Sequence, residues 1–483
     1  MNEAPADAGS YRDPSGRVFV LGDRVLRTVM PRAAADFEFV RSTGVLQSLI
    51  AEGSAIAEEQ VDPGGLPRSF NDARYVVQHP KLPFISYPYE WCFTALKRAA
   101  LLHLDIQMRC LEQGVALSDA SAYNVQFLGP RPIFIDSLSF RRYREDEFWI
   151  GHKQFCEQFL NPLLLRALLG VPHNAWYRGG LEGIPTTELN RLLPLHRKLS
   201  WNVLTNVVMP ASFQRAATGG GDAGMPAAGR FPRAAMQRML ERLRKWISRL
   251  QLADQGRTVW ADYARETSYA ADEAERKRAL IVKFAAAVRP SMIWDIGCNT
   301  GDYAKAALAS GAGYAVGFDF DQGALDAAFA RAESERLNFL PLFLDLANPT
   351  PSQGWAERER RGLIERASAD AILGLALVHH LAIGRNVPLE QVVAWLVGLA
   401  PNGIVEFVPK SDPMVQRLLQ LREDIFDDYS EETFAQHLQA RAEIVEVVDV
   451  SATGRRLFWF ARPERARSSS TPMRQILTFD ASR

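Results

Sequence analysis

The sequence predicts an α/β protein of two parts, with a doubly wound, mostly parallel sheet in its C-terminal half and an α+β domain before it. The chain of 483 residues is too long for one ordinary core. Near the N-terminus, two apolar runs separated by Gly22-Asp23 indicate a hairpin, and Ala33 to Ala51 is expected to form a helix. After Ser291, helix-like segments alternate with strand-like runs, as in a parallel sheet: Met292–Ile296, Ala315–Phe318, Phe339–Leu344, Ala371–Leu375 and Gly403–Phe407.

The composition is that of an ordinary soluble globular protein, with 47% hydrophobic and 23% charged residues. The 56 basic residues balance 56 acidic ones, so a whole-protein electrostatic attraction to nucleic acid is not expected. No apolar run reaches about 18 residues, and no signal-peptide pattern begins the chain, so no membrane partner is expected. The four cysteines lack C-x-x-C spacing, which fits a cytoplasmic location.

Shifts in composition divide the chain into segments. The clearest boundary is a Gly/Ala-rich stretch that is poor in bulky apolar residues. The expected segments are a disordered start (1–10), an N-terminal α+β domain (11–216), a linker (217–230), a helical connector or lid (231–290), the sheet domain (291–462) and a tail (463–483).

The turn after the first strand of the sheet domain carries the first chemical signal. Asp295-Ile-Gly297-Cys298-Asn-Thr-Gly301 runs from a strand into a glycine-rich turn and then into a helix. The two glycines allow close approach of the backbone to a ligand, and the helix start offers free N–H groups. This D-x-G-x-x-x-G pattern resembles motif I of class I S-adenosylmethionine-dependent methyltransferases. The resemblance implies that Asp295 holds the methionine amino group of the cofactor, directly or through water, and that Cys298 is a small residue of the cofactor loop.

Three further strand ends extend this resemblance. Asp319 ends the second strand, 18 residues after Gly301, where the family has an acidic residue that binds both ribose hydroxyls. Asp345 ends the third strand, where the family has an Asp that binds the adenine amino group. Leu377 follows the fourth strand, in the region that lines the methionine part of the cofactor. The implied cofactor is therefore S-adenosylmethionine.

The acceptor of the methyl group is not evident in the sequence. His379 and His380 lie where a general base could take a proton, although such histidines also serve packing. The [D/N]-P-P-[Y/F/W] pattern, which the family uses to methylate exocyclic amines of bases, does not follow the fourth strand. We therefore expect a small-molecule or glycan-type acceptor and no nucleic acid, and the oligomeric state is left open.

A second motif lies in the N-terminal domain. Asp119 precedes Asn124 by five residues, and Asp136 follows a short hairpin and three apolar residues. This segment resembles the catalytic segment of the protein-kinase-like fold, where an Asp takes the proton of the acceptor hydroxyl and an Asn and a second Asp hold magnesium. The resemblance implies Asp119 as a catalytic residue, Asn124 and Asp136 as metal ligands, and ATP with Mg²⁺ as cofactors.

The N-terminal domain also departs from that fold. Arg27 stands where a strand lysine would bind phosphates, with Glu38 on the next helix as its expected ion-pair partner. A glycine-rich loop is missing, and so is the usual His-Arg or His-Gly before the Asp. Two alternatives stay open: a helical accessory domain in which Asp119 and Asn124 cap a turn, or a degenerate kinase fold that orients the methyl acceptor.

Taken whole, the arrangement is similar to bacterial NoeA-like methyltransferases. The predicted function is S-adenosylmethionine-dependent methyl transfer. One alternative is a bifunctional kinase and methyltransferase. Another is a modifier of RNA or protein that uses the N-terminal domain for recognition. A helix expected over residues 234–250 would help such recognition through a basic stripe, which could equally be an ordinary solvated face. The stripe consists of Arg238, Arg242, Lys245 and Arg249.

Overall fold

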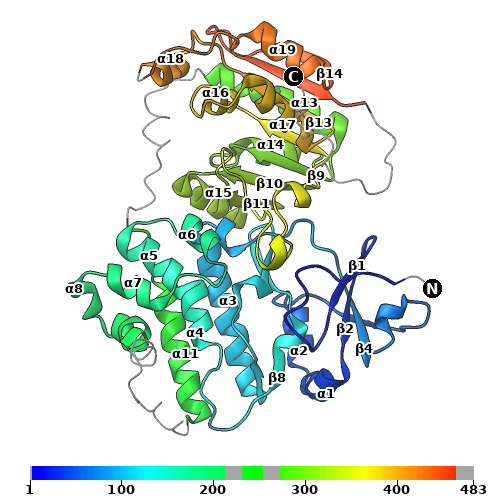
Figure 1. The fold of residues 1–483 in the computed structure, drawn as a ribbon, viewed down its shortest axis with the longest axis vertical. Helices are drawn as coiled ribbons and strands as arrows, with labels where there is room; N and C mark the ends of the chain where they lie inside the picture. Colours follow the sequence, from blue (N-terminus) through cyan, green and yellow to red (C-terminus); the bar gives the residue numbers. More distant parts are fainter. Residues whose placement is uncertain (1–2, 213–230, 254–270, 421, 464–483) are drawn as a thin grey trace. The chain divides into compact units, whose positions relative to one another are not determined.

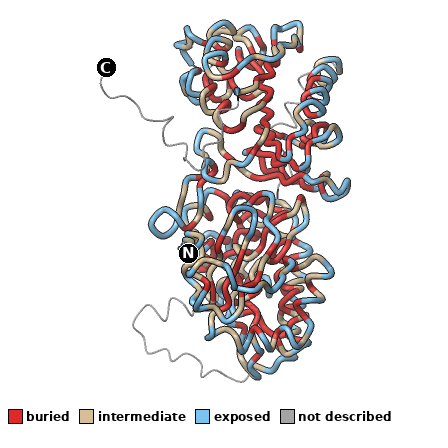
Figure 2. The backbone as a smooth tube through the Cα atoms, turned by 90° about the vertical axis from the view of Figure 1, so that its right-hand side faces the viewer, coloured by how far each residue is buried: buried red, intermediate tan, exposed pale blue. Residues whose placement is uncertain are grey.

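The computed structural model describes residues 3–212, 231–253, 271–420 and 422–463 (Figure 1). The chain separates into two compact units, Met1–Arg257 and Thr258–Arg483, and each is described by itself. The predicted linker at 217–230 lies outside the described residues, and so does the tail from residue 464 onward. Within both units the buried residues gather along the strands and the inner helices (Figure 2).

The first unit begins with a four-stranded antiparallel sheet in the order β1-β2-β4-β3. Its first hairpin turns at Gly22, whose φ of 62° is easily reached by glycine, as the sequence predicted. The helix expected over residues 33–51 is instead two helices, because Gly44 takes a left-handed φ of 73° and ends the first one. The elements are β1 (Val18–Leu21), β2 (Arg24–Val29), α1 (Ala34–Thr43), α2 (Val45–Ala51), β3 (Glu59–Val61) and β4 (Tyr75–His79).

A long helix, α3 (Phe93–Glu112), forms the centre of the rest of this unit, with most of its apolar side chains buried. Two short antiparallel pairs pack near it: β5 (Val115–Leu117) with β8 (Phe140–Arg142), and β6 (Val125–Leu128) with β7 (Arg131–Phe134). Helical segments complete the unit: α4 (His152–Phe155), a π-helix (Cys156–Leu160), α5 (Asn161–Leu169), α6 (Asn174–Gly179), α7 (Thr186–Leu192), α8 (Leu195–Lys198), α9 (Trp201–Val203) and a second π-helix (Leu204–Val208).

Hydrogen bonds hold residues 3–10, which differs from the expectation of disorder over residues 1–10, whose first two residues lie outside the described ranges. Ala4 and Ser69 exchange two hydrogen bonds, of 3.1 and 2.8 Å, between the Ala4 backbone and the Ser69 hydroxyl. The Asp7 amide donates to the Val18 carbonyl at 2.7 Å. The Val18 amide donates to the Ser10 hydroxyl at 2.8 Å, and Ala4 packs against the core cluster around Phe19 and Phe70, so these hydrogen bonds and a small apolar contact hold residues 3–10 against the sheet.

The segment 231–290, predicted as one connector or lid, is divided between the two units. Helix α11 (Arg233–Ser248) packs on α3 in the first unit, and Arg244 forms a two-bond ion pair with Asp105 of α3. Its predicted basic stripe is exposed: Arg238, Arg242, Lys245 and Arg249. Helix α13 (Ala271–Val288) belongs to the second unit, where it packs on the helix that follows the first strand of the sheet.

The second unit is built on a seven-stranded sheet in the order β11-β10-β9-β12-β13-β15-β14. The five strands that the sequence predicted pair in parallel, and β15 runs antiparallel to both of its neighbours. The strands are β9 (Met292–Ile296), β10 (Tyr314–Asp319), β11 (Phe339–Phe343), β12 (Ala371–Gly374), β13 (Asn402–Phe407), β14 (Glu443–Asp449) and β15 (Arg456–Ala461). The predicted doubly wound, mostly parallel sheet is confirmed.

The chain winds outward from β9 in one direction, to β10 and β11, and from β12 in the other, to β13. Because crossovers between parallel strands are right-handed, these opposite directions place helices on both faces of the sheet. The connecting helices are α14 (Asp302–Ala309), α15 (Gln322–Ser334), α16 (Val378–Ala382), α17 (Leu389–Leu399), α18 (Pro413–Leu419) and α19 (Glu431–Gln439). The strand order reverses between β9 and β12, and in doubly wound folds ligands bind at the carboxyl ends of the strands at such a point.

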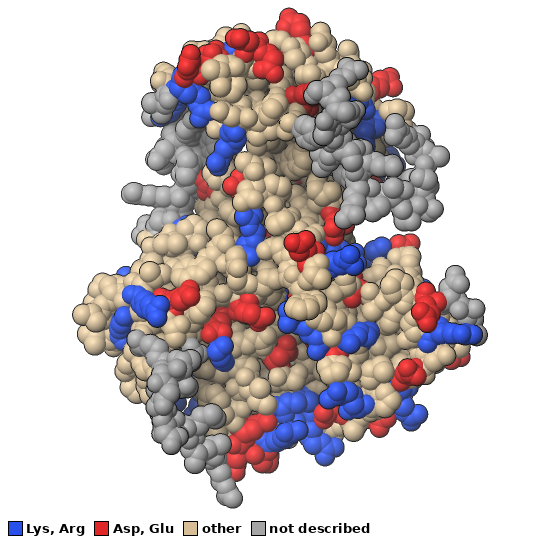
Figure 3. Space-filling model, in the orientation of Figure 1, with Lys and Arg blue, Asp and Glu red and all other residues tan. Residues whose placement is uncertain are grey.

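Two whole-chain expectations concern the surface. Basic and acidic side chains are interspersed on the face shown in Figure 3, in line with the balanced composition. Among the helices that the structure describes, none combines the length and the apolar character needed to cross a bilayer.

Candidate functional site

The glycine loop lies at the carboxyl end of β9, beside the point where the strand order reverses. Gly297 and Gly301 have φ values of 81° and 79°, in the left-handed region that favours glycine. A Cβ on Gly301 would collide with the ring of Phe339, so no larger residue fits there without a shift. The amides of Gly297 and Cys298 donate to the Phe318 carbonyl at 2.8 and 3.0 Å, which fixes the loop against β10.

Asp295 is a buried carboxyl directly before this loop. Its Oδ2 accepts the amide of Ala304, in the first turn of α14, at 3.1 Å. Burial raises the pKa of Asp295 to about 7, and the hydrogen bond from Ala304 only partly offsets this effect. Such a carboxyl ionises readily when an ammonium group comes close, because the opposite charge repays the cost of desolvation.

Asp319 ends β10 and reaches the glycine loop from the next strand. Its Oδ2 accepts the amide of Asn299 at 2.8 Å, and its Oδ1 accepts the amide of Asp321 at 2.9 Å. Burial raises the pKa of Asp319. A third backbone hydrogen bond comes from Phe320, and because a carboxylate has about four acceptor positions, the group can still accept a hydroxyl hydrogen. The structure thus brings together Asp295, Gly297, Gly301 and Asp319.

Asp345 and Cys298 border the same strand ends. The Leu344 amide donates to the Asp319 carbonyl at 2.9 Å, so the end of β11 lies beside the end of β10. The half-buried Asp345 accepts the Ala347 amide at 3.0 Å through Oδ1. Burial raises the pKa of the Cys298 thiol well above its usual range, so this side chain is a neutral loop residue and no nucleophile.

The turn after β12 carries Leu377, His379 and His380. Leu377 and His379 are buried, and the rings of the two histidines lie 4.2 Å apart between centroids. Burial lowers the pKa of both, that of His380 to about 4, and the charge of Arg455 acts in the same direction. Both imidazoles are therefore uncharged at neutral pH, the state in which a histidine can accept a proton.

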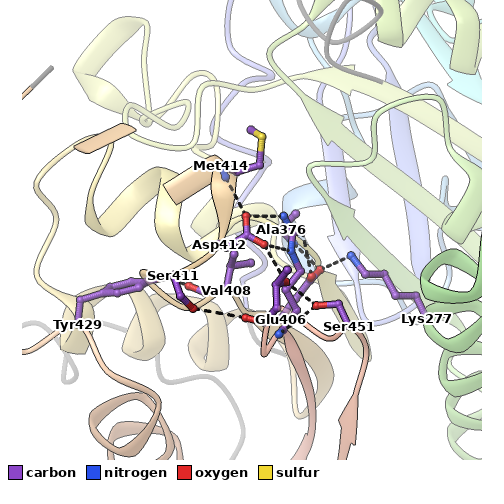
Figure 4. A network of polar contacts seen from close by, with 11 residues as sticks. Lys277, Ala376, Glu406, Val408, Ser411, Asp412, Met414, Tyr429 and Ser451 are labelled. Atoms are coloured by element: carbon purple, nitrogen blue, oxygen red, sulfur yellow. Dashed lines mark hydrogen bonds and ion pairs between the residues drawn. The ribbon is translucent and has the colours of Figure 1, made fainter. Parts of the chain in front are cut away.

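Sequence reasoning missed a buried ion network beside this turn (Figure 4). Oε2 of Glu406, on β13, accepts the Lys277 ammonium at 2.8 Å and the Ala376 amide at 2.9 Å. Arg455 lies 3.4 Å from Oε1 of Glu406 and binds Asp412 through two hydrogen bonds of 2.7 and 2.9 Å. One available signal was Glu406 itself, a charged residue inside the otherwise apolar strand Gly403–Phe407, because such residues are buried only when paired.

Tyr303 is a second residue that the sequence analysis did not single out. It lies in the first turn of α14, half-buried. Burial raises its pKa to about 12, and the negative charges of Glu406 and Asp295 contribute to that shift. Its position in the first turn of α14, whose Ala304 amide binds Asp295, places it at the same edge of the sheet.

In the first unit, the structure brings together the three residues predicted from the kinase-like motif. Asn124 Nδ2 lies 3.1 Å from both carboxylate oxygens of Asp119. The Ser139 hydroxyl lies 2.8 Å from Asp119 Oδ1 and 2.8 Å from Asp136 Oδ2. Burial, followed by the charge of Asp136, raises the pKa of Asp119 to about 6.

One expectation for this cluster is wrong. Arg27 pairs with Asp136, Nη2 to Oδ1 at 2.6 Å, in a largely buried contact. Glu38, the expected partner of Arg27, instead accepts a hydrogen bond from the Tyr75 hydroxyl. The reason is that the guanidinium of Arg27, on β2, meets the half-buried carboxylate of Asp136, while Glu38 stays exposed on α1. Over the described ranges, no group of three or more His, Cys, Asp or Glu side chains is arranged to hold a metal ion.

Several solved structures are similar to about two fifths of the chain. Magnesium protoporphyrin IX methyltransferase (ChlM) from Synechocystis PCC 6803, with bound SAH, is 16% identical, and the match covers 42% of this chain and 94% of that chain at a TM-score of 0.31. The N-methyltransferase NodS from Bradyrhizobium japonicum WM9 is 15% identical over 40% of this chain and 99% of that chain, at a TM-score of 0.30. WbdD is 18% identical over 39% of this chain and 40% of that chain, at 0.28.

The sequence comparison reaches over nearly the whole chain. No family model matches it. The nodulation protein NoeA of Rhizobium meliloti (strain 1021), however, is 48% identical over 459 residues, which are 95% of this chain and 96% of that protein. At this identity and coverage, the chain belongs to the family of the nodulation protein NoeA.

Proposed function

We propose that the protein is an enzyme that transfers the methyl group of S-adenosylmethionine to a small-molecule or glycan-type acceptor. The observation that carries the proposal is the glycine loop at the reversal point of the sheet, with Asp295 and Asp319 buried on either side of it. In doubly wound sheets a glycine-rich loop at this place binds its ligand at the carboxyl ends of the strands.

The residues present fit this cofactor. At Gly297 a Cβ would meet only the Leu375 carbonyl oxygen, at 3.8 Å, so a ligand can approach the backbone of the loop there. Asp295 supplies a carboxylate for the methionine ammonium, and Asp319 supplies a charged acceptor for the ribose hydroxyls. Asp345 Oδ2 serves as an acceptor for the adenine amino group.

The chemistry asks little more of the protein than alignment. The cofactor supplies a methyl group on a sulfonium, and the acceptor atom displaces it in line. Leu377 excludes water from the methionine side, and His379 or His380, uncharged at neutral pH, accepts the proton that the acceptor releases.

The cofactor site is tested by calorimetry with S-adenosylhomocysteine. Wild-type protein should bind it, and Asp319→Ala should weaken binding at least about tenfold, because the ribose hydroxyls lose a charged partner. Asp449→Ala is the control, since this carboxylate pairs with Arg456 on the surface near the far edge of the sheet. Equal affinity in wild type and Asp319→Ala would refute the site.

Nucleotide-dependent phosphotransfer in the first unit is a second candidate. The convergence of Asp119, Asn124 and Asp136 on one hydroxyl, that of Ser139, favours it, whereas the pairing of Arg27 with Asp136 opposes it by occupying an oxygen that a metal would need. Calorimetry with ATP and Mg²⁺ tests this candidate function. Nucleotide binding that Asp136→Ala removes would support phosphotransfer, and no binding at millimolar ATP would refute it.

A further inference from the structure

The turn between β12 and α16 contains a backbone conformation that needs support. Ala376 has a φ of 48°, in the left-handed region that a residue with a Cβ rarely adopts. Its amide points to Oε2 of Glu406, which accepts it at 2.9 Å (Figure 4). Because this contact exists only while the turn keeps its conformation, it compensates the backbone strain.

The same turn borders the glycine loop. A Cβ on Gly297 would lie 3.8 Å from the carbonyl oxygen of Leu375, the residue before Ala376. Leu377 and the two histidines follow directly. A change in the conformation of Ala376 would therefore move the side chains proposed to face the methyl group, and it would also reach the loop proposed to hold the cofactor.

The charge of Glu406 has its own partner. Its side chain is fully buried, and a lone carboxylate there would carry a large desolvation cost. Lys277, on α13, provides the opposite charge at 2.8 Å, and its side chain is only 8% exposed. Arg455 is held mainly by Asp412, so Lys277 and Glu406 form a pair whose charges can be removed together.

We propose that Glu406 is a positioning residue: it fixes the turn at Ala376, and Lys277 supplies the counter-charge that allows the carboxylate to be buried there. The inference rests on the proposed function in one respect, that this turn forms the acceptor side of the methyl-transfer site. Through Lys277, helix α13 is tied to the same turn.

Two double variants separate the positioning role from the charge. Lys277→Met with Glu406→Gln removes both charges but keeps an oxygen that can accept the Ala376 amide. Lys277→Met with Glu406→Met also removes both charges and keeps a similar length, but it offers no oxygen. The two variants differ only in the side-chain amide at position 406, whose oxygen can accept the Ala376 amide, so a loss in the second that the Gln variant does not show reports on the turn.

Hydrogen exchange of a peptide covering residues 371–380, measured by mass spectrometry without ligand, is the first readout. The Gln variant should exchange like wild type, and the Met variant should exchange at least about tenfold faster at the turn, because a buried amide without its partner opens more easily. Lys283→Met is the matched control on the same helix, since it breaks only an exposed pair with Glu446 and should change nothing.

Affinity for S-adenosylhomocysteine is the second readout. The Gln variant should bind within about threefold of wild type and the Met variant at least about tenfold more weakly. If both variants behave alike in both readouts, the positioning role is refuted. If wild type does not bind the ligand, the proposed function fails, while hydrogen exchange still decides the inference. Should the Met variant not fold, Glu406→Asp, which keeps the charge but shortens the reach to Ala376, is expected to show the same loss.

Discussion

The two units each bury a cluster of charged side chains, and the clusters are built differently. In the second unit two cations, Lys277 and Arg455, face two carboxylates, Glu406 and Asp412, and all four side chains are at most 8% exposed. In the first unit, Arg27 forms an ion pair with Asp136. Among the described contacts, the neighbouring Asp119 accepts hydrogen bonds only from neutral groups, those of Asn124 and Ser139.

The difference shows how each cluster accommodates the burial of its charged side chains. Paired charges of equal number satisfy one another, so the network of the second unit needs no proton or ligand to be complete. The cluster of the first unit carries an excess carboxylate, and its pKa is raised because burial and the neighbouring Asp136 both disfavour the charge. The balanced network of the second unit is suited to holding a turn in place. The cluster of the first unit, with its excess carboxylate, is suited to taking up a proton or a cation.

The largest effect is expected from removing one partner of the balanced network. Arg455→Met leaves Asp412 without its two hydrogen bonds from the guanidinium and should lower the free energy of unfolding of the second unit by about 3–5 kcal/mol. Urea unfolding followed by circular dichroism measures it. The neighbouring Arg456→Met is the control, since its pairs with Glu431 and Asp449 are partly exposed, and it should cost about 1 kcal/mol or less. Equal losses in the two variants would contradict the comparison.

The parts of the fold that the sequence predicted are those with a regular pattern. Buried parallel strands appear in the sequence as apolar runs, and two glycines at a fixed spacing indicate the turn from Asp295 to Gly301. Strands β14 and β15 were not predicted. Four of the seven residues of β14 are Ile or Val, but exposed and half-exposed residues alternate along it and none is buried, so its position at the sheet edge is set by pairing with β15.

The site was predictable where one residue type stands at a strand end, as for Asp319. It was not predictable where partners come from distant parts of the chain. Lys277 and Glu406 are 129 residues apart, and nothing local marks a lysine on an amphipathic helix as buried. The pairing of Arg27 with Asp136 could not be predicted either. Whether Arg27 pairs with Glu38 or with Asp136 depends on which carboxylate lies near it in three dimensions.

The smallest effect concerns the pH dependence of the unbalanced cluster. The folded state raises the pKa of Asp119 from its usual 3.8 to about 6, so protonated Asp119 favours folding. This contribution is fully present below about pH 4 and is lost as the pH rises through 6. A structural reason is visible at Ser139, whose single hydroxyl proton cannot serve both nearby carboxylates. When Asp119 is protonated it can donate to Ser139, while Ser139 donates to Asp136.

Asp119→Asn should therefore flatten the pH dependence of the stability of the first unit. Between pH 4 and pH 7 we expect the free energy of unfolding to fall by about 1–2 kcal/mol less in this variant than in wild type, because the amide has no proton to lose. Urea unfolding at a series of pH values measures the difference. Asp105→Asn is the control, since this carboxylate pairs with Arg244 at a site where both side chains are about 40% exposed. If wild type and Asp119→Asn show the same slope, Asp119 carries no excess charge, and the distinction between the two clusters is lost.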